Sequence, residues 1–232
     1  MNETIVISLG GSLVIPDSID IDFLKNFRDL ILSQTEKGKK FIIITGGGKI
    51  AREYINVVKN ITNPTDDNLD WIGIAVTRLN AELLRVVFGE SACPKVIIDP
   101  DSINEMNKPI MLGAGWKPGN SSDLAAVHSA ISVGAKKVIN LSNTDYVYDS
   151  DPKTNPSAKK IEKISWKDYR SIIPEEWNPG LNTPFDPVAS KKAEENGMTV
   201  IIMNGKSLQN LVKCLEGEDF MGTIISPDVG RL

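Results

Sequence analysis

The stretch IVISLGGSLVIP at Ile5–Pro16 and the stretch FIIITGGGKIAR at Phe41–Arg52 follow one pattern. In both, a run of strand-forming residues breaks directly into glycines. A strand that ends in glycine can bring its backbone N–H groups close to a bulky group, and phosphate is the usual one. Two such stretches therefore suggest two phosphate groups, or two phosphorylated ligands, at the ends of two buried strands.

The two glycine stretches differ in strength as phosphate-binding signals. LGGS at residues 9–12 is neither a Walker A loop nor a dinucleotide fingerprint, and taken alone it is better explained as a tight turn leaving a strand. TGGG at residues 45–48 precedes KIAREYI, whose helical spacing places free N–H groups at a helix N-terminus, where anions are favoured. Arg52 lies one turn into that helix and could hold the same phosphate with two hydrogen bonds. A glycine-rich turn with a solvated arginine is the alternative.

Strand-like and helical segments alternate along the chain. The expected strands are Thr4–Leu9, Lys40–Thr45, Lys95–Asp99, Pro109–Gly113, Lys136–Leu141, Thr199–Met203 and Gly222–Ser226. Besides the helix after TGGG, the spacing of apolar residues predicts helices at Ile21–Gln34, Leu69–Phe88, Ser121–Val133, Pro187–Asn196 and Leu208–Leu215. Because the strands are apolar throughout, we expect a mainly parallel sheet covered on both faces. Asn143–Leu181 is a long irregular excursion, and loops of that length are usually functional.

Composition and charge argue against several classes of protein. The chain of 232 residues can bury a substantial core, and its formal net charge of −4 argues against a general nucleic-acid binder. Two distant cysteines and one histidine support neither a disulfide framework nor a zinc site. The N-terminal MNETIVISLGG lacks the basic segment of a signal peptide, and no run approaches the ~18 apolar residues of a membrane span. We therefore expect a cytoplasmic protein with no membrane partner.

Two further segments leave strands and carry polar groups. Leu112–Asp123 reads LGAGWKPGNSSD and enters a helix at Ser121-Ser122-Asp123, where Asp123 alone is better explained as a favourable charge in the first turn. Leu141–Pro152 reads LSNTDYVYDSDP, which offers partners for a ribose and a base but also suits Asx turns. Ligands collect at the carboxyl edge of open parallel sheets, so all four segments are expected at one edge.

Seven stretches, in order along nearly the whole chain, resemble the amino acid kinase superfamily and, within it, the archaeal type of UMP (uridylate) kinase. They are LGGSL, GGGKIAREYI, LDWIGIAVTRLNAELL, PGNSSDLAAV, TDYVYDSDPKTNPSAKK, PFDPVASKKA and GTIISP. Each alone is weak, but seven in the right order form a specific signal. The resemblance implies an α/β fold, a three-layer α/β/α sandwich with a mainly parallel central sheet, in one domain spanning residues 1–232.

The same resemblance implies an activity. The reaction expected is transfer of the γ-phosphoryl group of ATP to UMP, which gives UDP and ADP in pyrimidine nucleotide synthesis. Mg²⁺ would be carried on ATP, with no dedicated metal cage from the protein. The acceptor would bind over the N-terminal half, about residues 1–135, and ATP over the C-terminal half, about residues 136–232. Members of this family are usually hexamers, so a homohexamer is expected.

The resemblance also assigns roles by position. Near the transferred group it places Gly10, Gly11, Asp123, Asp186 and Lys191, with the two glycines donating backbone N–H groups to the phosphoryl. For UMP it places Gly47, Gly48 and Arg52 at the phosphate, Asp70 at the ribose, and Gly115, Ser121 and Ser122 in a loop, Gly113–Ser122, that faces uracil. For ATP it places Gly10, Gly11, Ser12, Ser142, Asn143, Tyr148 and Asp151. These assignments suit phosphoryl transfer, which needs positioning and charge neutralisation rather than a protein nucleophile.

The chain departs from the family pattern at three places. Many superfamily members have a lysine at the position of Ser8, and we hypothesise that Lys49 or Lys117 compensates for its loss. The acceptor loop usually carries a threonine near its start, whereas here Trp116 either stacks on a base or packs against another subunit. The family's glycine after the nucleotide-side aspartate is Tyr146 here, which would reshape the adenine pocket.

Two other functions stay open on the same fold. One is a kinase of another small phosphate, such as isopentenyl phosphate; Asp70 argues against it, because a carboxylate suits ribose hydroxyls and not a prenyl tail. The other is a non-catalytic nucleotide sensor or storage protein, for which Ser8 and Tyr146 are the only support.

Overall fold

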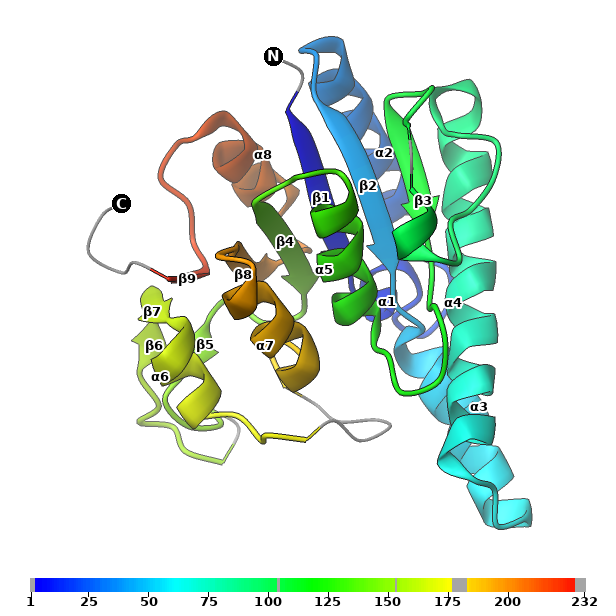
Figure 1. The fold of residues 1–232 in the computed structure, drawn as a ribbon, viewed down its shortest axis with the longest axis vertical. Coiled ribbons are helices and arrows are strands. Elements are labelled where there is room, and N and C mark those ends of the chain that lie inside the picture. The colour runs from blue at the N-terminus through cyan, green and yellow to red at the C-terminus, as the bar shows by residue number, and fades with distance from the viewer. Residues whose placement is uncertain (1–2, 104, 153, 177–182, 228–232) are drawn as a thin grey trace.

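A computed structural model describes residues 3–103, 105–152, 154–176 and 183–227 of the chain. Its centre is a seven-stranded sheet in the order β3-β2-β1-β4-β8-β9-β7 (Figure 1). The strands are β1 (Thr4–Leu9), β2 (Lys40–Thr45), β3 (Ile110–Gly113), β4 (Lys137–Ser142), β7 (Lys163–Ser165), β8 (Thr199–Asn204) and β9 (Thr223–Ser226). Neighbouring strands run parallel except β8 and β9, which are antiparallel. The mainly parallel sheet expected from the sequence is confirmed.

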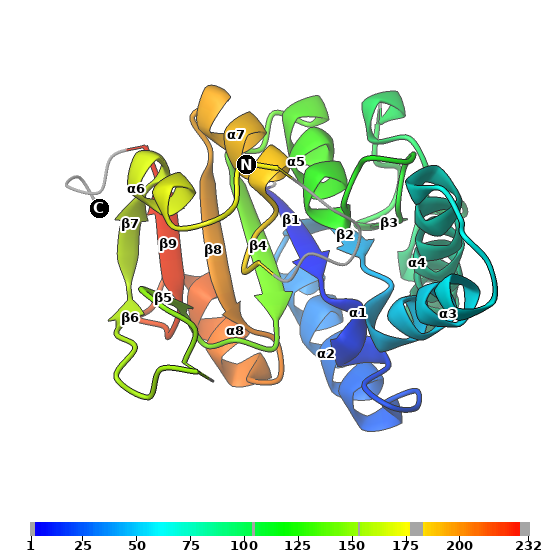
Figure 2. The ribbon, with the colours of Figure 1, turned by 90° about the horizontal axis from the view of Figure 1, so that it is seen from below.

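Helices cover both faces of this sheet. They are α1 (Gly11–Val14), α2 (Ile21–Glu36), α3 (Gly48–Ile61), α4 (Asp66–Phe88), α5 (Ser122–Ser132), α6 (Trp166–Ser171), α7 (Pro187–Glu195) and α8 (Leu208–Glu216). Figure 2 shows α2 and α8 on one side of the sheet and α5 and α7 on the other. The three-layer α/β/α arrangement is therefore confirmed. Within the described part of the chain, every helix is too short or too polar to cross a bilayer.

The alternation of side chains along β1 and β2 separates two hydrophobic cores. Ile5, Ile7 and Leu9 point into one core, with residues of α2 and α8. Val6 and Ile42 point into the other, with residues of α5, α6 and α7. Successive residues of a strand face opposite sides, so a central strand with helices on both faces is apolar along most of its length. This explains the uninterrupted apolar runs of the sequence.

Local capping explains where the longer helices begin. Asp20 caps α2 by accepting a hydrogen bond from Phe23 N at 2.9 Å, and Thr65 caps α4. Ser121 caps α5 through Leu124 N, and Asp186 caps α7, whose first residue is Pro187. A side-chain oxygen at this position satisfies one of the N–H groups that lack an intrahelical acceptor.

The strand expected at Lys95–Asp99 is not formed. Only Ile97 pairs with β3, through an isolated bridge to Gly113, and its N–H donates to Leu112 O at 2.8 Å. Pro94 and Pro100 flank this stretch and have no N–H to donate, so the edge pairing does not extend. The expectation of a strand here was therefore wrong, although the stretch does lie along the edge of the sheet.

The excursion expected to be irregular at Asn143–Leu181 contains regular structure. Its described residues form a two-stranded ribbon of β5 (Val147–Tyr148) and β6 (Lys160–Ile161), then β7 and α6. Buried Trp166 and Tyr169 attach α6 to the core, where Trp166 Nε1 donates to Met198 O at 2.8 Å. Residues 153 and 177–181 of the excursion lie outside the described residues.

Candidate active site

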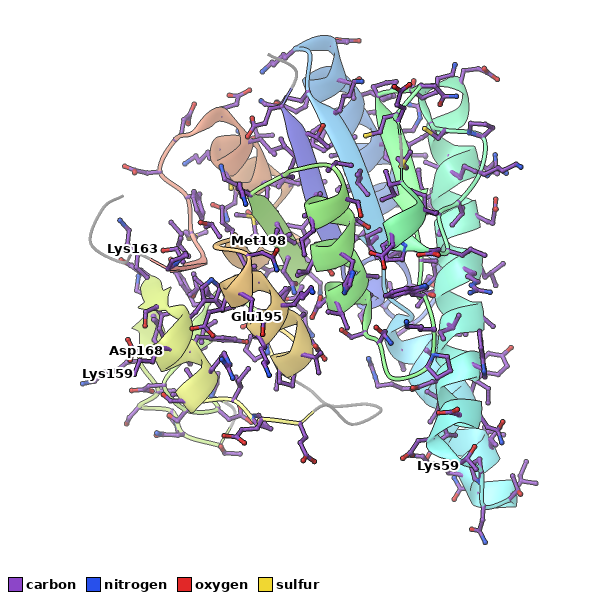
Figure 3. The ribbon with its side chains drawn as sticks, viewed as in Figure 1. Lys59, Lys159, Lys163, Asp168, Glu195 and Met198 are labelled. Atoms are coloured by element: carbon purple, nitrogen blue, oxygen red, sulfur yellow. The ribbon has the colours of Figure 1, made fainter. Side chains whose placement is uncertain are left out.

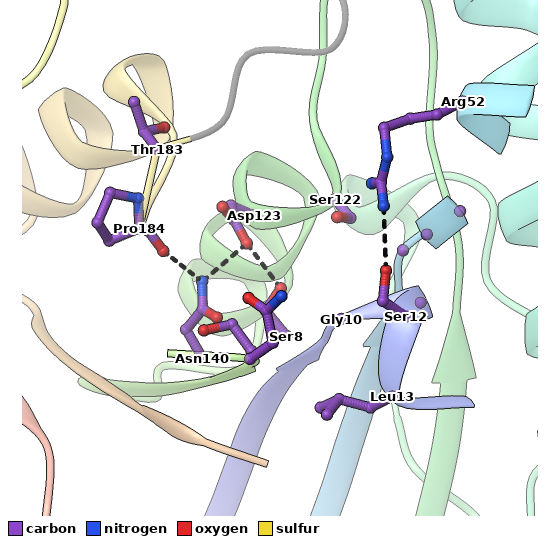
Figure 4. A pocket seen from close by; sticks show the side chains of 16 residues that line it. Ser8, Gly10, Ser12, Leu13, Arg52, Ser122, Asp123, Asn140, Thr183 and Pro184 are labelled. Atoms are coloured by element: carbon purple, nitrogen blue, oxygen red, sulfur yellow. Dashed lines mark hydrogen bonds between the residues drawn. The ribbon is translucent and has the colours of Figure 1, made fainter. Parts of the chain in front are cut away.

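A hollow of about 580 Å³ lies at the carboxyl ends of β1, β2 and β4 (Figure 4). It is lined by the two glycine stretches, Arg52 of α3, the start of α5, the end of β4 and residues 183–184. The two glycine stretches thus meet here with one end of each of the other two segments, Leu112–Asp123 and Leu141–Pro152. The expectation that polar and glycine-rich strand ends share one edge of the sheet is confirmed.

The two glycine stretches touch each other backbone to backbone. A Cβ atom on Gly11 would lie 2.3 Å from Gly46 O and 2.5 Å from Gly48 N. A Cβ atom on Gly48, whose φ is +64°, would lie 2.5 Å from the carbonyl carbon of Gly11. No side chain fits at either position. Part of the reason for the glycines is therefore that one loop packs against the other.

The backbone amides of these stretches are not equally available to a ligand. Gly10 N donates to Leu141 O at 2.8 Å and Gly46 N to Leu9 O at 2.9 Å, which extends the sheet pairing into the loops. The expected donation from Gly10 to a phosphoryl group must be corrected, because that amide is already used. Gly11 begins α1 and Gly48 begins α3, and the first N–H groups of a helix have no acceptor within it.

Arg52 joins the two glycine stretches across the hollow. Its Nη2 atom donates to Ser12 Oγ at 3.3 Å (Figure 4). Among the described residues that line the hollow, it carries the only positive charge. It lies one turn into α3, next to the amides of Gly47 and Gly48 at the start of the helix. This combination of helix N-terminus and guanidinium is suited to a phosphate group.

Asp123 is the centre of a hydrogen-bond network on the opposite side of the hollow. Its Oδ1 atom accepts from Ser8 Oγ at 2.7 Å and from Asn140 Nδ2 at 3.1 Å (Figure 4). Its Oδ2 atom accepts from Asp186 N at 3.2 Å. The Asn140 amide also donates to Pro184 O at 3.4 Å, so the network joins β1, β4, α5 and the segment before α7.

Burial raises the pKa of the two carboxyl groups in this network. Desolvation raises the pKa of Asp123 to about 6, while the hydrogen bond from Ser8 acts in the opposite direction. The carboxyl of Asp186, which accepts from Ala189 N at 2.6 Å, also has a raised pKa because of burial. Asp186 therefore contacts Asp123 through its backbone and uses its side chain to cap α7. The two aspartates lie close together, with Asp123 in the lining of the hollow, and their roles near the transferred group remain predictions.

The loop after β3 is held by one face of α4. Thr77 Oγ1 accepts from Gly115 N at 2.8 Å, and Arg78 Nη2 donates to Trp116 O at 3.1 Å. Asp70 Oδ2 accepts from Gly119 N at 2.7 Å, and desolvation raises the pKa of this carboxyl. Asp70, expected at the acceptor ribose, is bonded to the acceptor loop in this conformation.

A second hollow of about 610 Å³ adjoins the first. The two share Ser142, Asn143, Thr183 and Pro184. The second is lined mainly by residues 142–152, in and around β5, and by Ile172–Pro174. The residues expected to bind ATP on this side, Ser142, Asn143, Tyr148 and Asp151, all line it. Two cavities of nucleotide size thus meet at one junction.

Several expected site residues lie outside the first hollow. Lys191 is exposed on α7 and lines a separate hollow with Lys167 and Arg170. Lys49 forms ion pairs with Asp17 and Glu53. The ammonium group of Lys117 lies 3.9 Å from the centre of the Trp116 ring. The structure thus brings none of these three lysines to the hollow, and their proposed roles remain predictions.

Trp116 packs within its own chain. Its ring lies 5.2 Å from that of His128, whose Nδ1 atom is 2.9 Å from Asp101 Oδ1. This contact does not test the two expectations for Trp116, stacking on a base and packing against another subunit, and both remain predictions. It leaves His128 in a structural position away from the hollow's lining.

Three polar residues of the site were not anticipated from the sequence. Asn140 lies in the apolar strand KVINLS, and Asn80 and Thr77 occupy buried positions of α4. Asn80 Nδ2 donates to Gly46 O at 2.9 Å and so supports the second glycine stretch. Each is a polar residue at a position where the periodicity of the element calls for an apolar one. That mismatch could have identified the three as site residues from the sequence.

A mainly parallel α/β/α sandwich with paired glycine loops and two joined hollows defines a class of phosphate-handling proteins. The sequence model of the amino acid kinase family matches residues 3–204, and the chain belongs to this family.

Within the family, the chain is similar to the archaeal uridylate kinases, as its seven motifs predict. It is 35% identical to the uridylate kinase of Thermococcus onnurineus over 226 residues, which cover 96% of this chain and 99% of that protein. It is 32% identical to the uridylate kinase of Thermoplasma acidophilum over 232 residues, which cover 98% and 99%.

Solved structures agree with this placement. The crystal structure of uridylate kinase from Archaeoglobus fulgidus superimposes with a TM-score of 0.81 at 32% identity and covers 97% of this chain and 100% of that one. The UMP kinase of Bacillus anthracis has a TM-score of 0.78 at 21% identity and covers 97% and 96%, which indicates the same fold.

Proposed function

We propose that this protein is a UMP kinase that transfers the γ-phosphoryl group of ATP to UMP, giving UDP and ADP for pyrimidine nucleotide synthesis. The observation that carries the proposal is the junction of the two hollows. One holds the glycine stretches and Arg52, and the other holds the loop around β5. Two nucleotides that enter from opposite sides would bring their phosphates together at the shared residues.

The chain's own groups supply what phosphoryl transfer requires. In this proposal the amides of Gly47 and Gly48 and the guanidinium of Arg52 bind the phosphate of UMP. The amide of Gly11, in backbone contact with that loop, orients the phosphoryl group in transfer. Asp123 is fixed by Ser8 and positions the surrounding groups, since a UMP phosphate oxygen is already ionised and needs no base. Catalysis then rests on positioning and on neutralising the charge of the equatorial oxygens.

The donor set of the first hollow fits Mg²⁺ that is carried on ATP. In the described residues, no group of three or more acidic, histidine or cysteine side chains could hold a metal ion. Mg²⁺ usually keeps several waters and binds through phosphates with one or two carboxylates. Asp123 is the carboxylate available to it in the first hollow, directly or through water. When bound, the ion would neutralise charge on the phosphates.

An assay of ADP release with a panel of acceptors tests the proposal. We expect turnover with UMP to exceed that with CMP, AMP or isopentenyl phosphate. Arg52→Gln should raise KM for UMP at least tenfold, because a hydrogen-bonded charge on the phosphate is worth about 1.5–3 kcal/mol. Preference for the prenyl phosphate would reject UMP as acceptor, and ATP binding without ADP release would favour a nucleotide sensor.

We also propose a cytoplasmic homohexamer. The exposed apolar side chains of α3 support self-assembly: only Ala51 of this helix is buried, while Val57 and Ile61 are 55% and 79% exposed. Figure 3 shows the end of this helix, marked by Lys59, extending beyond the body of the molecule. Sedimentation analysis should give the mass of six chains, and Val57→Glu with Ile61→Glu should reduce it. A monomeric wild-type protein would contradict this part of the proposal.

A further inference from the structure

Tyr146 lies immediately before β5, at the edge of the second hollow. The residue between the two tyrosines, Val147, is 1% exposed, and its N–H donates to Thr223 Oγ1 at 2.8 Å. Tyr148 follows buried Val147 in β5 and so faces the opposite side of the strand, away from the core, while Tyr146 precedes the strand. Both line the second hollow.

The ring of Tyr146 is held in place from one side. The ammonium group of Lys160 lies 4.9 Å from the ring centre. Lys160 is fixed in turn by Glu162 at 2.7 Å and by its pairing with Tyr148 across the β5-β6 ribbon. Tyr146 belongs to the described lining of the hollow and Lys160 does not. A cation over one face restricts an aromatic ring without covering the other face.

The chemistry of the second hollow suits an uncharged, planar group. Besides the two tyrosines, the lining includes Ile172, Ile173 and Pro174, which add apolar surface to it. The described lining contains no lysine or arginine, whereas three aspartates belong to it. A phosphate would be repelled here and would be favoured toward the first hollow, where Arg52 lies. The second hollow is therefore the place for the base and sugar of a nucleotide.

We propose that Tyr146 stacks on the base of the donor nucleotide and strengthens its binding. This inference rests on the proposed kinase function, because it assigns the second hollow to the donor. Stacking on an aromatic ring tolerates different bases, so the contribution extends to ATP and GTP alike.

Calorimetric titration with a non-hydrolysable ATP analogue and Mg²⁺ tests the inference. Tyr146→Ala should weaken binding about tenfold, within the range that a single base–aromatic stack supplies. Tyr146→Phe keeps the ring and should bind as tightly as the wild type. Inorganic tripolyphosphate, which has no base, should bind equally to all three proteins. In turnover assays, Tyr146→Ala should raise KM for ATP and leave kcat and KM for UMP unchanged.

Two results would overturn the inference. One is unchanged binding of the ATP analogue to Tyr146→Ala, and the other is an equal loss of tripolyphosphate binding, which would indicate a damaged loop. The two measurements distinguish failure of this inference from failure of the kinase proposal. If only the kinase proposal fails, ATP binding will still depend on Tyr146, but no ADP will be released with UMP. Thermal unfolding of the variants shows whether each is folded at the temperature of the titration.

Discussion

Gly11 and Gly48 determine the shape of the site because neither position has room for a Cβ atom. Their backbones are so close that a methyl group at either would overlap main-chain atoms of the other loop. Main chain in a packed loop cannot move aside as a flexible side chain can. The geometry of the proposed phosphate-binding region is thus fixed by contact between the loops themselves.

Replacing Gly11 by alanine should destabilise the protein and abolish phosphoryl transfer. Overpacking costs about 1–3 kcal/mol in well-packed cores, and the clash here is with backbone atoms at 2.3 and 2.5 Å. Urea unfolding measures the loss. Gly73→Ala in α4 is the matched control, because its Cβ would meet only Ile55 Cδ1, at 3.9 Å. It should be neutral or stabilising by up to about 1 kcal/mol. Equal effects at the two glycines would contradict the contact argument.

Ser8 and Asp123 give a residue-scale prediction that depends on pH. The pKa of Asp123 is raised to about 6 from an ordinary 3.8, so the folded state binds this proton more tightly than the unfolded state. That contribution to stability is fully present below about pH 4 and is lost as the pH rises through 6. Ser8 donates to the ionised carboxylate, so Ser8→Ala should raise the pKa of Asp123 further.

Ser8→Ala should therefore cost more stability at pH 8 than at pH 4. A hydrogen bond to a charged group contributes about 1.5–3 kcal/mol, and only the ionised carboxylate gains this much from the serine. Unfolding free energies at the two pH values measure the difference. In the background of Asp123→Asn the cost of Ser8→Ala should not change with pH. A cost that is the same at both pH values in the wild-type background would refute the assignment.

At the scale of elements, α4 acts as the support for the acceptor loop. Thr77 lies 8% exposed and connects the helix to Gly115, with Arg78 and Asp70 holding the loop further along. The helix is long and packs against both β2 and β3, so a rigid element holds the loop in position. Elements of this kind fix a loop more firmly than contacts among loop residues do.

Thr77→Val should loosen that loop. The substitution keeps the side-chain shape but leaves the buried N–H of Gly115 without an acceptor, which costs about 1–3 kcal/mol. We expect KM for UMP to rise severalfold while KM for ATP stays unchanged, as measured in steady-state assays. Thr77→Ser retains the hydroxyl and should restore both stability and KM. If the valine and serine variants behave alike, the hydrogen bond does not support the loop.

The sequence predicted most elements because their patterns are local. Apolar runs identified β1, β2, β3, β4, β8 and β9, and helical spacing located α2, α3, α4, α5, α7 and α8. Lys95–Asp99 failed because its pairing depends on flanking prolines and on β3. The site was predictable where glycines or motifs marked it. The bonds of Asn140 and Thr77 were not, because they join residues far apart in the chain.

At the scale of the whole molecule, the two proposed halves share one sheet. β1 and β4 pair in register from Val6 with Val138 to Leu9 with Leu141, directly across the boundary near residue 135. Core residues from both sides of this boundary pack in the same clusters. A boundary through the middle of a sheet leaves no independent core on either side, so the halves are expected to fold together.

Unfolding should therefore be a single cooperative transition. We expect urea curves followed by far-UV circular dichroism and by tryptophan fluorescence to coincide, as two-state unfolding requires. Trp71 and Trp116 belong to the first half and Trp166 and Trp177 to the second, so variants that keep the tryptophans of only one half separate the two fluorescence signals. Two transitions with different midpoints would show that the halves are independent domains.

The contact between the glycine loops also determines where this scaffold can be redesigned. Because each loop occupies the space into which a side chain of the other would extend, neither can be varied alone, and a library of substitutions at Gly11 or Gly48 would return few folded proteins. The acceptor loop, by contrast, is attached to α4 by separate hydrogen bonds that can be exchanged one at a time. A new acceptor would be sought by changing α4 and residues 113–120, with the phosphate cradle left intact.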